Sequence, residues 1–474
     1  MTSTVGLDAE AQWRRLRSTT WSMCVLIFLV AFESFAVTTV MPTVSRVLDG
    51  ASMYAFAFAG PLATGVIGMV LAGTWCDRHG PRGPLTLAAA LFAAGLVLAG
   101  LAPSMPVLVL GRLVQGLGGG AFTVVFYVIV GRLYAPVLHP RVFAGFSAAW
   151  VLPALVGPSL AGAVAQHIGW RWVFLGVALL VVPIALVLLP AVRPIGAPDE
   201  PGEAEPRGRL AWAVLAAGAV LGLNLALHVP VPWSAAIAVV TSVVALVALR
   251  AIVPAGSLRA ARGLPAVIAT RALVAGAFVG AEVYLPYLLT DRYGFAPTTA
   301  GITLTVAALA WAATSWVQGR LGERLPHRRA IVIGAVLLLV AVGGVTATAA
   351  AHLSPVVAIG SWLFAGAGMG VMYARLTVLV LAFSTPGSQG TNSSALSIAD
   401  SIGAALALAF TGLAFTGVVA SDAHPDAPFT ASLLIALVFA AGAAVVSPRV
   451  SSRARRQGQA EATTADAASS ALRT

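Results

Sequence analysis

The stretch GTWCDRHGPR (73–82) recurs 246 residues later in the chain as GRLGERLPHR (319–328). Both copies keep the leading glycine, one acid and two arginines at matching places, namely Gly73 and Gly319, Asp77 and Glu323, Arg78 and Arg324, and Arg82 and Arg328. Charges that match in both segments indicate that the chain contains an internal repeat. The alternative is that packed membrane helices share small-residue patterns, but such patterns do not explain the charges.

A second pair of segments repeats at almost the same offset. GLGGG (116–120) lies over GAGMG (366–370) at an offset of 250 residues. The chain is therefore predicted to contain two six-helix bundles, 20–190 and 268–447, separated by two additional helices in 210–250.

Composition places these helices in a lipid bilayer. Hydrophobic residues make up 59% of the chain and charged residues only 9%, against about 25% charged residues in a soluble domain. A membrane crossing takes about 20 apolar residues, and charges or Pro/Gly turns divide the chain into fourteen runs of that size. The sequence thus predicts an all-α integral membrane protein with fourteen spans.

The arginines fix the expected orientation of these spans. All 28 basic residues are arginine, and with a cytoplasmic N-terminus 23 of them fall on the inner side. This agrees with the excess of basic residues in cytoplasmic loops, so both termini are predicted to be cytoplasmic. The predicted cytoplasmic segments are the N-terminus 1–19, a linker 191–209 rich in Pro and acids, and a disordered tail 448–474.

Charged side chains inside predicted spans are candidate functional groups. Glu33 and Arg112 lie at depths of about 12 and 8 Å from the outer surface, so they can meet inside the first bundle. Because a neighbouring arginine changes how readily a buried acid takes a proton, the pair is predicted to couple transport to protons. The alternative is a static buried ion pair.

The second bundle has candidates of its own. Glu282 matches Glu33 in depth and in repeat position, and it is either a second proton or cation site or a hydrogen-bonding partner between helices. Asp400 is a weaker candidate of the same kind, as is Arg375, which can also extend to the membrane surface.

Four motifs in order resemble the major facilitator superfamily, and in particular its fourteen-helix drug:proton antiporters of the multidrug efflux type. The resemblance covers residues 20–447 and rests on FESFAVTTVMPTV (32–44), GTWCDRHGPR (73–82), GRLVQGLGGG (111–120), and LVGPSLAG (155–162) with GWRWVF (169–174). Two departures are that Glu33 stands where the family typically has aspartate, and Ala161 replaces a glycine.

The resemblance implies two sets of gating residues. The loop containing Gly73, Asp77, Arg78 and Arg82 is expected to hold the cytoplasmic side closed when the transporter faces outward. In the fifth helix, Gly157, Pro158 and Gly162 are expected to bend the helix, to permit close packing and to favour export. Anchoring of positive charge at the membrane surface would explain the arginines of the loop but not the acid beside them.

Aromatic residues on the predicted spans can line an apolar substrate cavity, and such a cavity suits lipophilic cations. The candidates are Phe35, Tyr127, Trp150, Tyr284, Trp311 and Trp362.

The sequence accordingly predicts a proton-coupled antiporter that exports drug-like molecules and confers antibiotic resistance. A dedicated exporter of one metabolite, such as an antibiotic, siderophore or lipid precursor, remains an alternative, and a membrane enzyme or scaffold is a weaker one. The expected partners are a small-molecule substrate, protons and the bilayer, without nucleic acid. We expect no catalytic residues, metal or cofactor, the proton gradient as energy source, and a monomer in the plasma (inner) membrane of a bacterium.

Overall fold

The computed structural model describes residues 10–50, 53–196, 208–226, 233–295, 297–321, 324–419 and 426–450, and all regular structure in these ranges is helical. Twelve helices among the described residues are long and apolar enough to cross a membrane. Two further helices, α8 (Arg209–Ala226) and α12 (Pro297–Leu321), are not in that set. The structure therefore supports twelve spans where the sequence predicted fourteen.

The first bundle comprises six helices, with α5 held between α3 and α4, and α2 packed on α6 and α7. Their bounds are α2 Arg17–Val47, α3 Tyr54–His79, α4 Arg82–Gly100, α5 Met105–Leu133, α6 His139–His167 and α7 Arg171–Val192.

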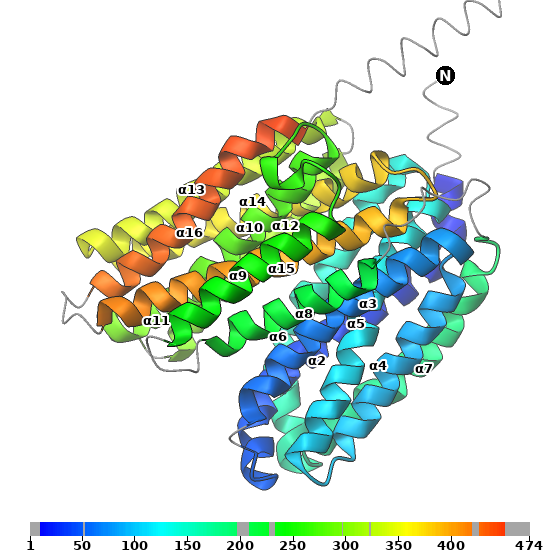
Figure 1. The fold of residues 1–474 in the computed structure, drawn as a ribbon, viewed down its shortest axis with the longest axis horizontal. Helices are drawn as coiled ribbons and strands as arrows, with labels where there is room; N and C mark the ends of the chain where they lie inside the picture. Colours follow the sequence, from blue (N-terminus) through cyan, green and yellow to red (C-terminus); the bar gives the residue numbers. More distant parts are fainter. Residues whose placement is uncertain are drawn as a thin grey trace, which may run out of the picture.

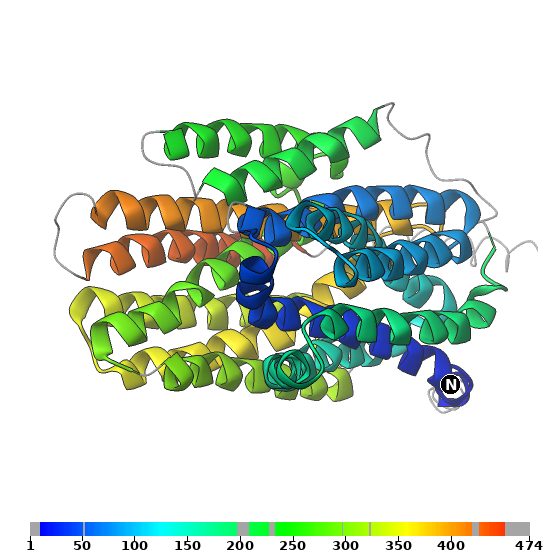
Figure 2. The same cartoon turned by 90° about the horizontal axis from the view of Figure 1, so that it is seen from below.

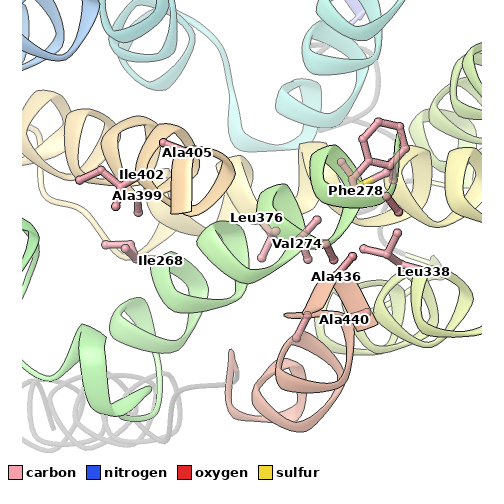
Figure 3. Packing of buried hydrophobic residues seen from close by; sticks show 14 of the residues in the cluster. Ile268, Val274, Phe278, Leu338, Leu376, Ala399, Ile402, Ala405, Ala436 and Ala440 are labelled. Atoms are coloured by element: carbon pink, nitrogen blue, oxygen red, sulfur yellow. The ribbon is translucent and has the colours of Figure 1, made fainter. Parts of the chain in front are cut away.

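The second bundle repeats this arrangement, with α14 held between α12 and α13 and α10 packed on α15 and α16. Its other helices are α10 Leu264–Glu282, α11 Tyr284–Tyr293, α13 His327–Ala351, α14 Pro355–Ala382, α15 Gln389–Val419 and α16 Ala427–Val446. Figure 3 shows part of its core, where Val274 and Phe278 of α10 lie among small and branched side chains of the neighbouring helices.

Glycines explain why the middle helix of each group of three lies so close to its neighbours. A Cβ on Gly120 of α5 would lie 2.0 Å from the Gly65 carbonyl oxygen of α3, and one on Gly118 would lie 2.5 Å from the Phe92 nitrogen of α4. In α14 a Cβ on Gly366 would lie 2.0 Å from the Ala307 carbonyl oxygen of α12. The matched segments GLGGG and GAGMG thus perform the same packing role in both bundles.

The two helices between the bundles, α8 and α9 (Trp233–Ile252), form an antiparallel hairpin on the outside of the molecule. The hairpin packs against α3 of the first bundle and α15 of the second (Figure 2). It therefore lies along the seam between the bundles.

The two bundles meet at one end and diverge at the other (Figure 1). Contacts between them involve α3 and α5 with α15, and α6 with α12 and α14. The closest of these contacts lie where α3 ends and α15 begins, and we call this end of the molecule the closed end.

Candidate functional site

Glu33 and Arg112 form a buried network in the first bundle. The Arg112 guanidinium donates to Glu33 Oε1, and the two residues are only 2% and 5% exposed. Gln115, one turn along α5, accepts from Arg112 Nη1 at 2.5 Å and donates from Nε2 to Glu33 Oε2 at 2.5 Å. Both carboxylate oxygens of Glu33 are therefore hydrogen-bonded to side chains of a single helix.

A proline in α3 supplies the third partner of Arg112. Arg112 Nε donates to the Ala57 carbonyl oxygen at 3.0 Å. Pro61, four residues further along, has no N–H and so leaves this carbonyl without its usual helical partner. Arg112 is thus held by three helices, and its position depends on how α2, α3 and α5 are arranged.

Glu282 lies in a different environment, at a break in the helix. It is the last residue of α10, it is partly exposed, and α11 begins two residues later. Pro286 lacks the N–H that would bond the Glu282 carbonyl, which accounts for the break. Glu282 makes no hydrogen bond or ion pair with the part of the chain that the structure describes.

The repeat relates this acid to Glu33 but gives it a different neighbour. At the offset of 250 that aligns Gly116 with Gly366, Arg112 corresponds to Trp362. Trp362 is fully buried, and its Nε1 has no hydrogen-bond partner among the described residues. It stacks on Phe278, which lies one helical turn before Glu282, at a centroid distance of 5.2 Å. The second bundle therefore keeps the acid but replaces the arginine with an aromatic wall, which Trp311 extends by an edge contact with Phe278 at 5.5 Å.

Asp400 belongs to a third group that the sequence did not indicate. Arg271 Nε donates to Asp400 Oδ1 at 2.6 Å, and the Tyr373 hydroxyl donates to the same carboxylate at 3.1 Å. The Arg271 guanidinium also lies 3.2 Å from the centre of the Tyr373 ring. Arg271 is one of the 23 arginines predicted on the inner side, whereas it is buried within α10.

Asp77 connects the two bundles at the closed end. Its Oδ1 and Oδ2 accept hydrogen bonds from the backbone N–H groups of Gly390 and Thr391, each at 2.7 Å. These N–H groups lie in the first turn of α15, where a negative charge is favoured by the helix dipole. Gly73 stands against the same turn, and a Cβ there would lie 2.7 Å from the Gly390 carbonyl oxygen.

The arginine that accompanies Asp77 is Arg132 of α5, at 3.5 Å. Arg132 Nη2 also donates to the carbonyl oxygens of Cys76 at 3.0 Å and Pro386 at 2.8 Å, so it too joins the two bundles. Arg78 and Arg82, the arginines expected in this role, are both exposed.

The residues predicted to shape the fifth helix lie in α6, which runs unbroken through them. A Cβ on Gly157 would lie 3.4 Å from Phe35 Cβ of α2, which is ordinary van der Waals contact, so the packing at this position would also accept an alanine. A Cβ on Gly162 would lie 4.0 Å from Thr39 Cγ2, which also belongs to α2. The side chain of Pro158 lies outside the described residues.

The predicted pocket aromatics do not form one group. Trp311 and Trp362 belong to the aromatic wall beside Glu282, and the Trp311 ring also contacts Tyr373 at 5.3 Å. Tyr284 is buried against Phe415 at 5.4 Å. Tyr127 contacts Phe143, Phe35 is half-buried, and Trp150 is 46% exposed.

The sequence carries a local signal for several further residues of these groups. Gln115 follows Arg112 at the i,i+3 spacing that places two side chains on one helix face. Pro61 and Pro286 each mark a free carbonyl four residues earlier. Nothing in the sequence pairs Arg271 with Asp400, which are 129 residues apart.

No group of three or more His, Cys, Asp or Glu side chains suited to a metal ion occurs within the described ranges.

Comparison with known proteins gives a family match over most of the chain. Residues 23–408 match the family described as Major Facilitator Superfamily. A probable multidrug-efflux transporter of Mycobacterium tuberculosis is 27% identical over 459 residues, covering 86% of this chain and 95% of that protein.

Fungal relatives match over shorter segments. The efflux pump FUS6 of Gibberella moniliformis is 28% identical over 51% of this chain, and the acurin A biosynthesis cluster transporter of Aspergillus aculeatus is 33% identical over 32% of it. The matched segments span 44% and 27% of those relatives, so the chain covers less than half of their length.

Solved structures share the fold at low identity. A bacterial homologue of the iron transporter ferroportin in an outward-facing state has a TM-score of 0.65 at 17% identity, covering 92% of this chain and 99% of that one. The proton:xylose symporter XylE bound to a sugar analogue gives 0.64 at 15% identity, covering 91% and 94%. A partially occluded inward-open form of XylE from E. coli gives 0.56 at 15% identity, covering 91% and 96%.

Proposed function

This chain belongs to the Major Facilitator Superfamily, whose members are transporters and not enzymes, and on that premise we propose that it is a proton-coupled antiporter exporting lipophilic, often cationic molecules. The efflux transporters among its relatives support export. The proposed setting is the plasma membrane of a bacterium, where a monomer of this kind contributes to antibiotic resistance.

The observation that carries proton coupling is the buried Glu33–Arg112 pair. A carboxylate with 2% exposure stays ionised only while charged or polar donors hold it, and here both donors lie on α5. If α2 and α5 shift relative to each other, Glu33 loses these donors and takes up a proton instead. One charge moved through 100 mV supplies about 2.3 kcal/mol, enough for roughly a fifty-fold gradient.

We infer that the closed end faces the cytoplasm. The exposed arginines Arg78, Arg82, Arg328 and Arg329 lie at this end of the helices, as expected for a cytoplasmic surface. The bundles are in contact there and apart at the other end, which corresponds to an outward-facing state. In this orientation α8 and α12 also cross the bilayer, giving fourteen spans with both termini inside.

Substrate recognition is assigned to Glu282 and the aromatic wall beside it. A carboxylate that has no cationic partner among the described residues, next to stacked aromatic rings, favours an organic cation through charge and through cation–π contacts. Arg112 excludes such a ligand from the equivalent place in the first bundle. Glu33 thus binds the proton and Glu282 binds the substrate cation.

The test is uptake of a lipophilic cationic dye into everted vesicles against a proton gradient, comparing wild type with Glu33→Gln. We expect gradient-dependent uptake that falls at least tenfold in Glu33→Gln, because a neutral amide cannot exchange a proton. Glu10→Gln is the matched control, since Glu10 forms an ion pair with Arg141 in which both side chains are about half exposed. In the same assay Glu282→Gln is expected to weaken uptake of cationic dyes more than that of neutral ones.

Two results would overturn the assignment. Dye uptake by Glu33→Gln at the wild-type rate with unchanged dependence on the gradient would remove Glu33 from coupling. Loss of uptake in Glu10→Gln as well would mean that the assay reports folding and not coupling.

A dedicated metabolite exporter is the second candidate. It is favoured by the relative from a biosynthesis cluster, which matches 32% of this chain. Wild-type vesicles that transport none of a broad dye panel would favour this candidate.

A further inference from the structure

Arg209, the first residue of the α8–α9 hairpin, reaches the closed end of the seam. Its Nη1 donates to Thr391 Oγ1 at 2.8 Å, and its Nη2 donates to the Thr391 carbonyl oxygen at 3.3 Å. Arg209 is only 6% exposed, so its side chain points inward and not toward solvent. An arginine that served only to anchor the helix at the membrane surface would have no reason to be buried there.

Thr391 is also one of the two residues whose backbone N–H groups donate hydrogen bonds to Asp77. Asp77 Oδ2 accepts from the Thr391 N–H, while Arg209 donates to the hydroxyl and the carbonyl of the same residue. The first turn of α15 is therefore held from α3 by an acid and from α8 by an arginine. One residue of the second bundle carries both attachments.

The position of the hairpin makes the Arg209 contact depend on conformation. α8 packs along much of α3, where Ala213, Ala217 and Val220 lie in an apolar cluster with Val66 and Val70 that also includes residues of α15. Its contact with α15 is smaller, and Arg209 is the polar part of it. Because α8 packs more extensively on α3 than on α15, separation of α3 from α15 at the closed end would carry α8 with α3 and break the hydrogen bonds to Thr391.

We propose that Arg209 is a positioning residue of the gate and that the two helices between the bundles act as a strap that stabilises the closed end. This inference rests on the alternating access proposed above. In this proposal the hairpin shifts the conformational equilibrium toward the state in which the two bundles are in contact at the closed end. The chemistry is a guanidinium bound to one threonine, so it needs no ligand and no cofactor.

The experiment measures the distance between the bundles directly, without transport. Spin labels are placed at the exposed positions Thr86 on α4 and Arg329 on α13, in full-length protein with Cys24→Ala and Cys76→Ala. Hydrogen bonds to a charged group contribute enough for Arg209→Gln to raise the ratio of open to closed molecules about tenfold. Thr391→Val, which removes only the hydroxyl, is expected to give a smaller shift, and the double variant no more than Arg209→Gln alone.

The matched control is Arg250→Gln. Arg250 lies in the last turn of α9, the second helix of the same hairpin, and it is exposed. It should leave the distance distribution unchanged. An equal shift in Arg250→Gln, or no shift in Arg209→Gln, would overturn the proposal.

Asp77→Asn separates this inference from the function on which it rests. If Asp77→Asn opens the closed end and Arg209→Gln does not, the strap is wrong and alternating access at this seam stands. If neither variant changes the distance, the gate itself, and with it the proposed mechanism, is wrong.

Discussion

Replacing Arg112 with methionine should destabilise the protein far more than replacing the whole buried pair. In Arg112→Met, Glu33 keeps its charge at 2% exposure and retains only Gln115 as a donor. Removing one partner of a buried ion pair costs about 3–5 kcal/mol, because the other charge is left uncompensated. The Ala57 carbonyl, already without a helical partner, also loses its hydrogen bond.

The double variant Glu33→Leu with Arg112→Met removes both charges and keeps similar volume. Replacing a buried ion pair with apolar side chains often leaves the free energy of unfolding unchanged or raises it. We therefore expect the free energy of unfolding of the double variant to lie within about 2 kcal/mol of wild type. Its proton-coupled transport should nevertheless be lost. Stability and function would thus separate at this pair.

The assay is denaturant unfolding of the purified protein in detergent micelles, followed by tryptophan fluorescence. Arg141→Met is the control, since it breaks the exposed pair with Glu10 and should cost at most about 1 kcal/mol. The expected cost of the unpaired charge is refuted if the free energy of unfolding of Arg112→Met lies within 1 kcal/mol of wild type, taken as about the limit for an exposed pair. It is equally refuted if the double variant is as unstable as the single one.

Two further predictions concern packing and pH. Gly120→Ala should lower the free energy of unfolding by about 1–3 kcal/mol, because its Cβ would lie 2.0 Å from a backbone oxygen. Gly360→Ala is the control, since a Cβ there has no atom within 4 Å, and it should be neutral or stabilising in the same unfolding assay. Burial raises the pKa of Tyr134 to about 12, against about 10 in an unfolded chain, so the folded state binds the extra proton. The free energy of unfolding should therefore fall as pH rises from 10 to 12, by up to about 2.7 kcal/mol relative to Tyr134→Phe. If the free energies of unfolding of the two proteins differ by a constant amount across this range, the assignment is contradicted.

The helical architecture could be predicted because its signals are local or periodic. Apolar runs of the length of a bilayer, interrupted by charges or Pro/Gly turns, indicate where the helices lie, although the break between α10 and α11 falls inside one such run. The two glycine segments, 250 residues apart, also indicated that the same packing is used twice. The number of membrane crossings is less certain from composition alone, because α8 and α12 lack the length or the uniform apolarity of the other twelve helices.

The candidate site was predictable only where one motif carries both partners of a contact, or where depth alone brings them together. Glu33 and Arg112 could be matched by depth, and the structure places them in contact. Contacts such as Asp77 with the backbone of Gly390, 313 residues away, depend on how the bundles dock, and no local pattern encodes that. The same holds for Arg271 with Asp400 and for Arg209 with Thr391.

The closed end is built largely on main-chain atoms of the second bundle. Asp77 binds two backbone N–H groups, Arg132 binds the Pro386 carbonyl, and Gly73 lies against the Gly390 carbonyl. These three contacts do not depend on side-chain identity at the start of α15, whereas the contact of Arg209 with Thr391 does, because it uses the threonine hydroxyl. Evolution is therefore free to change the chemistry of that turn at positions other than Thr391, provided that the residues facing the seam stay small. Apart from Thr391, whether a substitution on the second-bundle side of this gate is tolerated should depend on side-chain volume alone, while Asp77 and Arg132 on the opposite side have no such freedom.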